Sequence, residues 1–393
     1  ILNSGQYLQL SGPDFFNAQI ILNEQKWAGN IEIHVKSSDW YLHQHEKDAN
    51  YDNVILHVVW ENDAPIFRKD NTEIPTLELK KYVSKEVLEN YLKLKTKKSW
   101  IYCENEIAST DSFIFKSWQE RLFFERLERK EIPILELLKE TENDWEAVLF
   151  CMLAKNFGLN TNGEAFLKMA KSIPFSVIRK ESFEVENLEA LLFGMANLIP
   201  TEVEDNYTKD IQKRFNYCIQ KYQFQKKIIT PVQFFKHRPD NFPTIRLAQL
   251  AMLYHMQQNL FSKIISVSRM EDFYQLFDIS VSNYWQTHYQ FDKESPRKKK
   301  SFSKSFIDLL VINTIVPIQF SFAKSQGKEI SETILETMNA VHPEKNNVIE
   351  KFATFGIKSK NAFETQSLLQ LKNEYCDKSK CLECGIGIQL LKG

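Results

Sequence analysis

Apolar and polar residues alternate with a period of two through much of the first sixty residues, which is typical of β-strands with one buried face. The alternation predicts strands over residues 14–22 and 27–36, joined by a turn at 23–26. A third strand is expected over 53–61, where both faces are apolar, as in a central strand. A shorter strand is expected over 65–68. The chain is therefore predicted to open with a hairpin in a small sheet.

From residue 84 onward the apolar positions recur every three to four residues, which predicts helices. Asp144, Asn206 and Ser331 are suitable N-caps for three of them. No strand is expected after residue 110, and residues 293–304 are expected to form a loop. The expected helices lie near residues 84–95, 111–130, 134–141, 144–157, 163–171, 186–198, 205–226, 244–261, 304–325, 331–341, 346–355 and 361–375.

This change of pattern predicts an α+β fold with two domains. Residues 1–105 would form a small unit around a mixed β-sheet, and residues 106–393 a large all-α region that ends in a cysteine cluster. Glycine and proline are few, with 11 and 12 residues, which fits long regular elements.

The composition is that of a globular chain, since 43% of its 393 residues are hydrophobic. It excludes the disordered and collagen-like classes. The net charge of −1 gives no overall basic field for nucleic acid, but it leaves a local basic groove open. The most apolar stretch, 306–322, contains Asp308, Asn313 and Pro317 and is expected to be a buried helix rather than a membrane span. No signal peptide is visible, so a cytoplasmic location is expected.

Two carboxylates are expected to meet on the N-terminal hairpin. Asp14 follows Pro13 at the start of the first strand, and Glu32 lies on the second strand. Two carboxylates on adjacent strands can share a divalent cation such as Mg²⁺ or Mn²⁺. His34 and Lys36 share a strand face with Glu32, where either side chain can orient a water or stabilise negative charge.

The pattern Pro13-Asp14 followed by Glu32-x-His34 resembles the PD-(D/E)-x-K nuclease superfamily. The resemblance implies a restriction-endonuclease-like fold, metal binding by Asp14 and Glu32, and orientation of the attacking water by His34 or Lys36. His34 occupies the lysine position of that family, so the role of this position differs here. Many superfamily members have an acidic helix before the Pro-Asp strand. The chain begins with Ile rather than Met, so such a helix would precede it.

Four of the eight histidines fall between residues 34 and 57. A His43-x-His45 pair is a possible transition-metal ligand pair. A metallohydrolase that uses His43, His45, Asp52 and His57 is therefore an alternative active site. The structural alternatives are an exposed loop for His43 and His45, and a hydrogen-bonded core residue for His57.

Three cysteines crowd into nine residues as Cys376-x₄-Cys381-x₂-Cys384. Such a group suits a 4Fe-4S cluster or Zn²⁺ better than a disulfide framework in a chain of this length. Cys103 is the candidate fourth ligand, with His342 and Cys218 as alternatives. The arrangement resembles the iron–sulfur staple of some helicase-associated nucleases. The structural alternative is three reduced thiols.

Basic residues in the helical region are candidates for nucleic acid contacts. Arg238 and Arg246 flank an expected helix start, where backbone N–H groups can bind phosphate. A second candidate is the run Lys298-Lys299-Lys300. The structural alternatives are a capped helix with a salt bridge and a solvated loop.

The segments Ser11–Trp40, Asn53–Trp60, Arg238–Leu247 and Tyr375–Cys384 also resemble an uncharacterised bacterial family known only as a domain of unknown function. That resemblance implies no activity.

Together these features predict a metal-dependent nuclease that hydrolyses phosphodiesters, with a structural iron–sulfur or zinc site. One alternative is an inactive nuclease-like module that binds nucleic acid or protein, and another is a histidine-dependent metallohydrolase. No nucleotide-hydrolysing motif of the form Gly-x₄-Gly-Lys-Ser/Thr occurs, so any helicase or other motor would be a separate chain.

Overall fold

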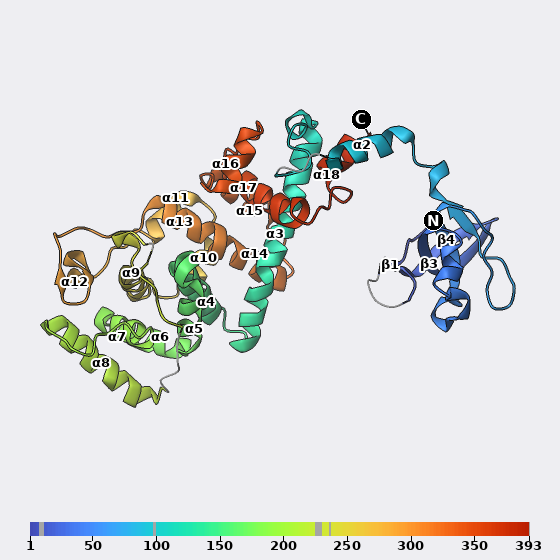
Figure 1. Cartoon of the computed structure of the whole chain (residues 1–393). Coiled ribbons are helices and arrows are strands. Elements are labelled where there is room, and N and C mark those ends of the chain that lie inside the picture. The colour runs from blue at the N-terminus through green and yellow to red at the C-terminus, as the bar shows by residue number, and fades with distance from the viewer. Residues whose placement is uncertain (8–11, 97–99, 225–229, 236, 393) are drawn as a thin grey trace. The chain divides into compact units, whose positions relative to one another are not determined.

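The protein is described here by a computed structural model covering residues 1–7, 12–96, 100–224, 230–235 and 237–392. The chain folds into two compact units (Figure 1). The first comprises Ile1–Glu104 and Gly387–Gly393, and the second comprises Asn105–Ile386. The first unit is built on a mixed sheet and the second is almost entirely helical, so the predicted α+β class is confirmed.

The sheet of the first unit has five strands in the order β1-β2-β3-β4-β5. Strands β1 to β3 pair antiparallel, whereas β3, β4 and β5 run parallel. Asn23 and Glu24 both have positive φ, as the tight β2–β3 hairpin turn requires. The strands are β1 (Gln6–Tyr7), β2 (Phe15–Leu22), β3 (Gln25–Lys36), β4 (Val54–Glu61) and β5 (Thr76–Glu78).

The parallel β3–β4 pair is linked by short helical turns rather than by one long helix. They are α1 (Asp39–Leu42), η1 (His45–Lys47) and η2 (Ala49–Tyr51). After β5 come η3 (Leu79–Lys81) and α2 (Lys85–Thr96). The strand expected over 65–68 is absent from the described residues, where only the bridge between Phe67 and Glu73 occurs.

The two faces of the sheet differ in chemistry. Ile31 lies opposite Leu56 across β3 and β4, and together with Val58 they belong to an apolar cluster on one face. Glu32 lies opposite His57, on the other face. Because side chains alternate along a strand, His34 shares that second face. Strand β4 is buried on both faces, and the second face also carries the polar side chains of Glu32, His34 and His57.

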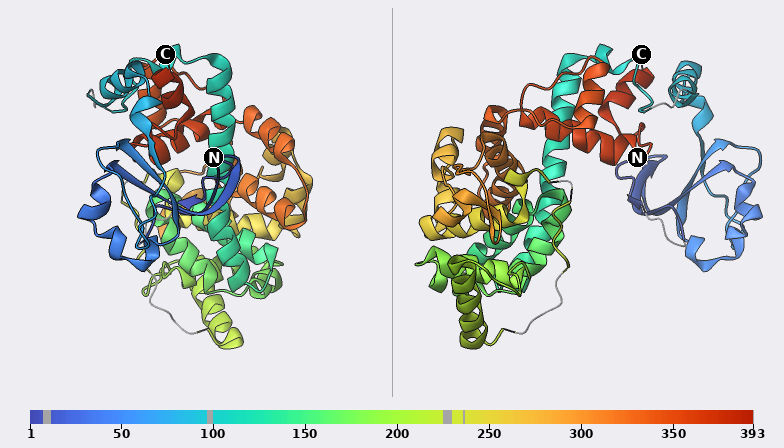
Figure 2. Two further views of the ribbon diagram at one scale, coloured as in Figure 1. Left: turned by 90° about the vertical axis from the view of Figure 1, so that its right-hand side faces the viewer. Right: turned by 60° about the vertical axis from the view of Figure 1, so that its left-hand side comes forward.

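The second unit packs its helices around one large apolar core. The long helix α3 contacts α4, α14 and α17 (Figure 2). The helices of this unit are η4 (Ile107–Ser109), α3 (Ser112–Glu140), α4 (Trp145–Phe157), α5 (Leu159–Lys171), α6 (Phe175–Glu181), α7 (Val185–Met195), α8 (Asn206–Tyr222), η5 (Pro239–Asn241), α9 (Pro243–Met256), α10 (Leu260–Ser266), α11 (Met270–Leu276), α12 (Asn283–Thr287), α13 (Lys304–Leu310), α14 (Val316–Ser325), α15 (Ser331–Ala340), α16 (Asn347–Thr354) and α17 (Ala362–Gln370). Most of the last helix, α18 (Gly385–Lys392), belongs to the first unit.

The helices differ from expectation in several places. Helices α6, α11 and α12 were not expected. Helix α3 continues through Pro133 as one element, because Ile134 and Leu137 beyond the proline are buried and their packing offsets the lost N–H bond. The segment expected as one helix over 244–261 is divided into α9 and α10. Residues 225 and 226, at the end of another expected helix, lie outside the described residues.

A two-stranded hairpin also occurs in the helical unit, although no strand was expected after residue 110. Strands β6 (His288–Gln290) and β7 (Lys293–Glu294) pair antiparallel. They are too short to produce a readable alternation in the sequence.

Two π-helical segments interrupt the helices of the second unit. They are η6 (Val311–Ile315), between α13 and α14, and η7 (Leu371–Cys376), after α17. The helical run Lys304–Ser325, which contains η6, is long and apolar enough to cross a membrane, with a mean hydropathy of 1.7. However, 72% of its most apolar window is buried inside the protein, so the run is a core helix, as predicted.

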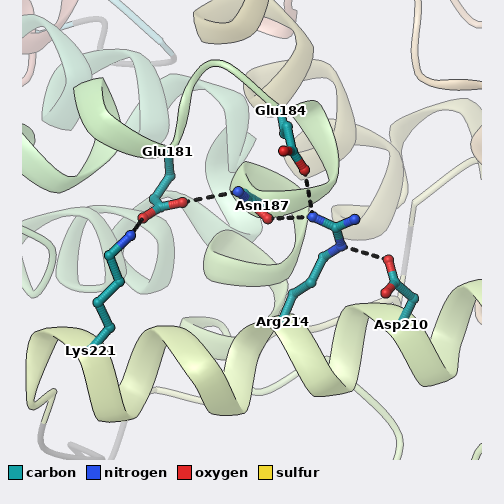
Figure 3. Close-up of polar contacts among 6 residues, drawn as sticks. All are labelled: Glu181, Glu184, Asn187, Asp210, Arg214 and Lys221. Carbon is teal, nitrogen blue, oxygen red and sulfur yellow. Dashed lines mark hydrogen bonds and ion pairs between the residues drawn. The ribbon is translucent and has the colours of Figure 1, made fainter.

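Polar side chains connect α8 to the α6–α7 corner (Figure 3). The Glu181 carboxylate accepts from Lys221 at 2.8 Å, and Arg214 donates to Asn187 at 2.6 Å. Arg214 also pairs with two carboxylates, those of Glu184 and Asp210. These bonds fix the outer surface of α8, while its inner face is buried.

Candidate metal centre

The strand register brings Asp14 and Glu32 together at the edge of the β2–β3 pair. The Asp14 N–H donates to Glu32 Oε2 at 3.2 Å, and the Ile33 N–H donates to Asp14 Oδ2 at 3.0 Å. Burial, followed by the neighbouring Asp14 charge, raises the pKa of Glu32 to about 7. The two carboxylates are therefore close neighbours, as the hairpin pattern predicted.

The β3–β4 connection carries His43 and His45 to the same place. Gln44, between them, adopts a left-handed conformation with φ of 60°, which turns the chain sharply. Asp63, just after β4, fixes the start of the connection by accepting from the Ser37 hydroxyl at 2.9 Å and the Ser38 hydroxyl at 2.8 Å. The Ser38 N–H also donates to Asp63, at 2.9 Å, and this bond, followed by those from the hydroxyls, lowers the pKa of Asp63 to about 2.

Aromatic packing holds the rings in place beneath this connection. Trp40, which is 1% exposed, packs with Tyr51 and Val54 in a small core of its own. The Tyr51 ring stacks on His45 with centroids 3.7 Å apart. The Trp40 ring meets His45 and His57 edge to face. The imidazoles are thus oriented by a rigid apolar support.

Four donor atoms converge above this support. His34 Nε2 lies 3.0 Å from His43 Nδ1 and 3.5 Å from Glu32 Oε1. His45 Nε2 also lies 3.5 Å from Glu32 Oε1. One ligand nitrogen from each of the three histidines falls within 4.8 Å of the other two.

These separations fit a four-coordinate transition metal. With metal–ligand bonds of roughly 2.0–2.1 Å, the edge of a tetrahedron is about 3.3 Å long. The three measured contacts of 3.0 and 3.5 Å lie on either side of that length. Three imidazoles and one carboxylate are the ligand types that zinc and similar ions prefer, whereas Mg²⁺ prefers oxygen alone.

Burial favours the neutral form of three of the imidazoles, which is the form that binds metal. Burial, followed by the neighbouring His45 and His43, lowers the pKa of His34 to about 4. Burial, followed by His34, lowers the pKa of His57 to about 4, and burial also lowers the pKa of His45. The contacts between Glu32 and the two histidines are therefore not ion pairs at neutral pH.

One buried polar atom of this group has no partner. His45 Nε2 is buried and has no hydrogen-bond partner within the described part of the chain. It lies 3.5 Å from Glu32 Oε1, so an ion bound between the two atoms would satisfy both.

His57 lies behind the ligand group. It is fully buried, and its Nε2 is 2.8 Å from Nδ1 of His34. If His34 ligates through Nε2, its Nδ1 carries the proton and donates to His57. This is the usual way in which a metal-bound histidine is oriented. His57 is thus placed to position His34 rather than to bind the ion.

Two other predicted site residues lie apart from the ligand atoms. Lys36 follows His34 on the same strand face, but its side chain is exposed. Asp52 pairs with Lys69 at the surface at 3.2 Å and is 54% exposed. The structure therefore does not bring Asp52 to the histidines, and its predicted role in a histidine metal site is wrong.

Two of the basic residues predicted to contact nucleic acid are buried. The Arg246 guanidinium lies 3.6 Å above the Phe306 ring, and burial lowers its pKa to about 10. The Lys300 ammonium donates to backbone carbonyls, including that of His288 at 2.8 Å. Neither cation is available to a phosphate backbone, so the prediction is wrong for Arg246 and Lys300.

The remaining basic candidates are exposed. Lys298 pairs with Asp240 at 2.6 Å, whereas Arg238 and Lys299 are exposed on the surface. The structure leaves a nucleic acid contact open for these three residues.

The cysteine trio lies in a tight turn between η7 and α18. The Ser379 N–H donates to the Cys376 carbonyl at 3.2 Å, and the Cys384 N–H donates to the Cys381 carbonyl at 3.3 Å. Cys384 is buried, and the other two are half-buried. Cys103 belongs to the other unit. Binding of a cluster or zinc here stays a prediction.

Sequence reasoning missed the residues that position the ligands. Nothing marks Asp63 as a support of the connection, because its partners are 25 and 26 residues away. Trp40 and Tyr51 are ordinary aromatic residues in the sequence. The only available signal was the density of histidines around them.

Comparison with known proteins identifies a family but no activity. The family described as "Protein of unknown function (DUF2851)" matches residues 1–347. The match contains the whole metal centre and ends before the cysteine turn, so the similarity expected over Tyr375–Cys384 lies outside it. Searches of curated proteins and of solved structures find no match. Because the match covers most of the chain, the protein belongs to the DUF2851 family.

Proposed function

We propose that the first unit is a metal-dependent hydrolase that cleaves phosphodiester bonds in nucleic acid. The observation that carries the proposal is the convergence of one nitrogen each from His34, His43 and His45, with Glu32 Oε1 at 3.5 Å from two of these histidines. A divalent ion held there would supply a Lewis acid for a phosphoryl oxygen. The nucleic acid substrate rests on the Pro13-Asp14 and Glu32 pattern of the PD-(D/E)-x-K superfamily.

The chain's own residues supply the other requirements of hydrolysis. Asp14 offers a second carboxylate beside Glu32, in reach of a water at the same site, and is a candidate general base. Lys36 extends from the same strand face into solvent, where its ammonium can bind the charged backbone of a substrate. His57 fixes the ring of His34.

The ligand set favours Zn²⁺ over Mg²⁺, with Mn²⁺ between them, since three of the four donors are imidazoles. This also supports the alternative of a histidine-dependent metallohydrolase with a different substrate. The two functions share the metal centre and differ only in what is cleaved.

The test is metal analysis followed by cleavage assays with Zn²⁺, Mn²⁺ or Mg²⁺ on DNA and RNA, each single- and double-stranded. We expect one Zn²⁺ at this centre, in addition to any metal held by the C-terminal cysteines, and metal-dependent cleavage. His45→Phe should lower the bound zinc by about one ion per chain and abolish cleavage, with Glu32→Gln and Asp14→Asn also inactive. His342→Gln, which changes a 75% exposed histidine in the other unit, is the matched control.

Three outcomes separate the alternatives. Metal binding with hydrolysis of simple esters or phosphomonoesters, but not of nucleic acid, would favour the general metallohydrolase. Metal-independent binding of nucleic acid without turnover would favour an inactive module. A protein with no bound metal after zinc loading and dialysis would refute the metal centre.

We further propose that Cys376, Cys381 and Cys384 ligate Zn²⁺ or a 4Fe-4S cluster with a structural role. Support comes from their spacing and from the two tight turns that hold their backbone. An ultraviolet–visible spectrum of anaerobically purified protein distinguishes the two, since only an iron–sulfur cluster absorbs in the visible range.

A further inference from the structure

The helical unit contains an open groove that none of the features above explains. Its volume is about 1170 Å³, above the roughly 300–1,000 Å³ of common small-ligand sites. It lies between the α4–α5 corner, the start of α13 with η6, and the segment before α16. Polar and apolar residues from these elements share the lining, including Lys155, Asn160, Lys304, Asp308, His342 and Lys345.

Two of the three acidic groups in the lining are already matched by neighbours. Glu164 pairs with Lys155 at 2.9 Å. Asp308 accepts from the Tyr274 hydroxyl at 2.6 Å and faces His342 at 3.4 Å. Glu164 therefore has a cation as its partner, and Asp308 has a hydrogen-bond donor.

The third acidic group, Glu344, is turned toward cations behind the groove wall. It accepts from the Gln366 amide and interacts with the charges of Arg126 and Lys130. Lys130 donates to Asn313, a residue of the groove lining, at 3.0 Å. Arg126 therefore adds a positive charge behind the wall, and Lys130 adds less, because burial lowers the pKa of Lys130 to about 7.

Lys304 and Lys345 remain as exposed cations of the lining. Neither forms an ion pair with the part of the chain that the structure describes. The Lys304 ammonium lies 5.2 Å from the centre of the Tyr274 ring, which holds it beside Asp308. With Arg126 behind the wall, four cations, including Lys155, Lys304 and Lys345, face the three acids of the lining, and this excess favours an anion.

The backbone at one end of the groove adds to this preference. Residues 159–161, which form the first turn of α5, line the groove, and no side chain caps this helix. Its first N–H groups lack partners within the helix and carry a partial positive charge. This feature supports the lysines and would not define a site alone.

The lining also offers apolar surface beside the cations. Leu159, Leu309, Ile312 and Pro343 contribute side chains, and Asn160 and Thr161 offer polar groups next to them. A ligand that matches all three features has an anionic group, hydroxyls and a flat apolar part.

We propose that this groove binds a nucleotide, with the phosphate at Lys304 and Lys345 and the base against the apolar residues. The nucleotide is either free or the phosphorylated end of a nucleic acid strand, because both present the same chemistry. The inference does not rest on the metal centre, whose residues all belong to the other unit.

The test is calorimetric titration of the full chain with AMP, adenosine, and a 12-nucleotide DNA with or without a 5′-phosphate. We expect AMP or the phosphorylated strand to bind, and adenosine and the unphosphorylated strand to bind at least about tenfold more weakly. Tighter binding of AMP than of the strand identifies a free nucleotide, and the reverse identifies a strand end.

Charge reversal locates the site. Lys304→Glu and Lys345→Glu should each weaken binding about tenfold or more, and both lysines are exposed, so the fold should be retained. Lys180→Glu changes an exposed lysine of α6 outside the groove and should bind normally. The proposal is overturned if no phosphorylated probe binds, if adenosine binds as well as AMP, or if the groove variants match the Lys180 variant. Intact metal-dependent cleavage in the groove variants would show that the two sites are separate.

Discussion

Replacing His57 by leucine tests whether this buried histidine positions a metal ligand or only fills the core. His57 is fully buried, and among the described residues its side chain forms one hydrogen bond, at 2.8 Å with His34. Leucine has a similar volume and cannot accept the His34 proton. The substitution therefore removes the hydrogen bond while the core stays filled.

The expected effects on stability and on metal affinity differ in size. In wild type, Nδ1 of His57 is buried without a partner among the described residues, which costs about 1–3 kcal/mol. The variant removes that cost but leaves Nδ1 of His34 unpaired, at a similar cost, so the net change in metal-free stability is about 1 kcal/mol or less. Loss of an orienting partner lowers metal affinity about 10–100-fold, or roughly 1.4–2.7 kcal/mol.

The assay combines zinc titration against a chromophoric chelator with urea unfolding of the metal-free protein. His57→Gln is the matched control, because its amide oxygen can replace Nε2 as acceptor and should restore most of the affinity. The reasoning is refuted if zinc binds His57→Leu as tightly as wild type. It is also refuted if both variants lose stability and affinity in parallel, since that is the behaviour of a purely structural residue.

Three further predictions concern the helical unit. Glu189 is fully buried, and burial raises its pKa from 4.5 to about 8, so its ionisation opposes folding as the pH rises. In urea unfolding, the free energy of unfolding of Glu189→Gln should exceed that of wild type by up to about 5 kcal/mol at pH 9 and by little at pH 5. Gly194→Ala would place a Cβ 2.1 Å from the Phe215 ring and should cost about 1–3 kcal/mol, seen as a lower Tm, whereas an unchanged Tm would contradict the tight α7–α8 packing. Serine at any of the three C-terminal cysteines should reduce bound zinc or iron, whereas Cys151→Ser, in the core, should not.

The sequence was most informative where a side chain's position follows from local geometry. Alternation along β3 places Glu32 and His34 on one face, and a tight hairpin places Asp14 beside them, so this part of the site was predictable. The preference of the site for a transition metal over Mg²⁺ could not be predicted. It depends on Gln44 turning the chain so that two histidines of a connection approach His34, and no periodic pattern encodes that turn.

The fold of the second unit shows the same limit for charged residues. A run of three lysines indicates a solvated or phosphate-binding segment only if all three remain at the surface. Lys300 does not, because the short β6–β7 hairpin places backbone carbonyls where its ammonium can bind them. Lys304 lies four residues later and has no adjacent basic residue in the sequence. It is exposed in a groove whose acidic side chains already have partners within the protein. A lysine can bind a ligand only if the fold has not already paired its ammonium with a carboxylate or a carbonyl. A count of lysines along the chain cannot supply that information.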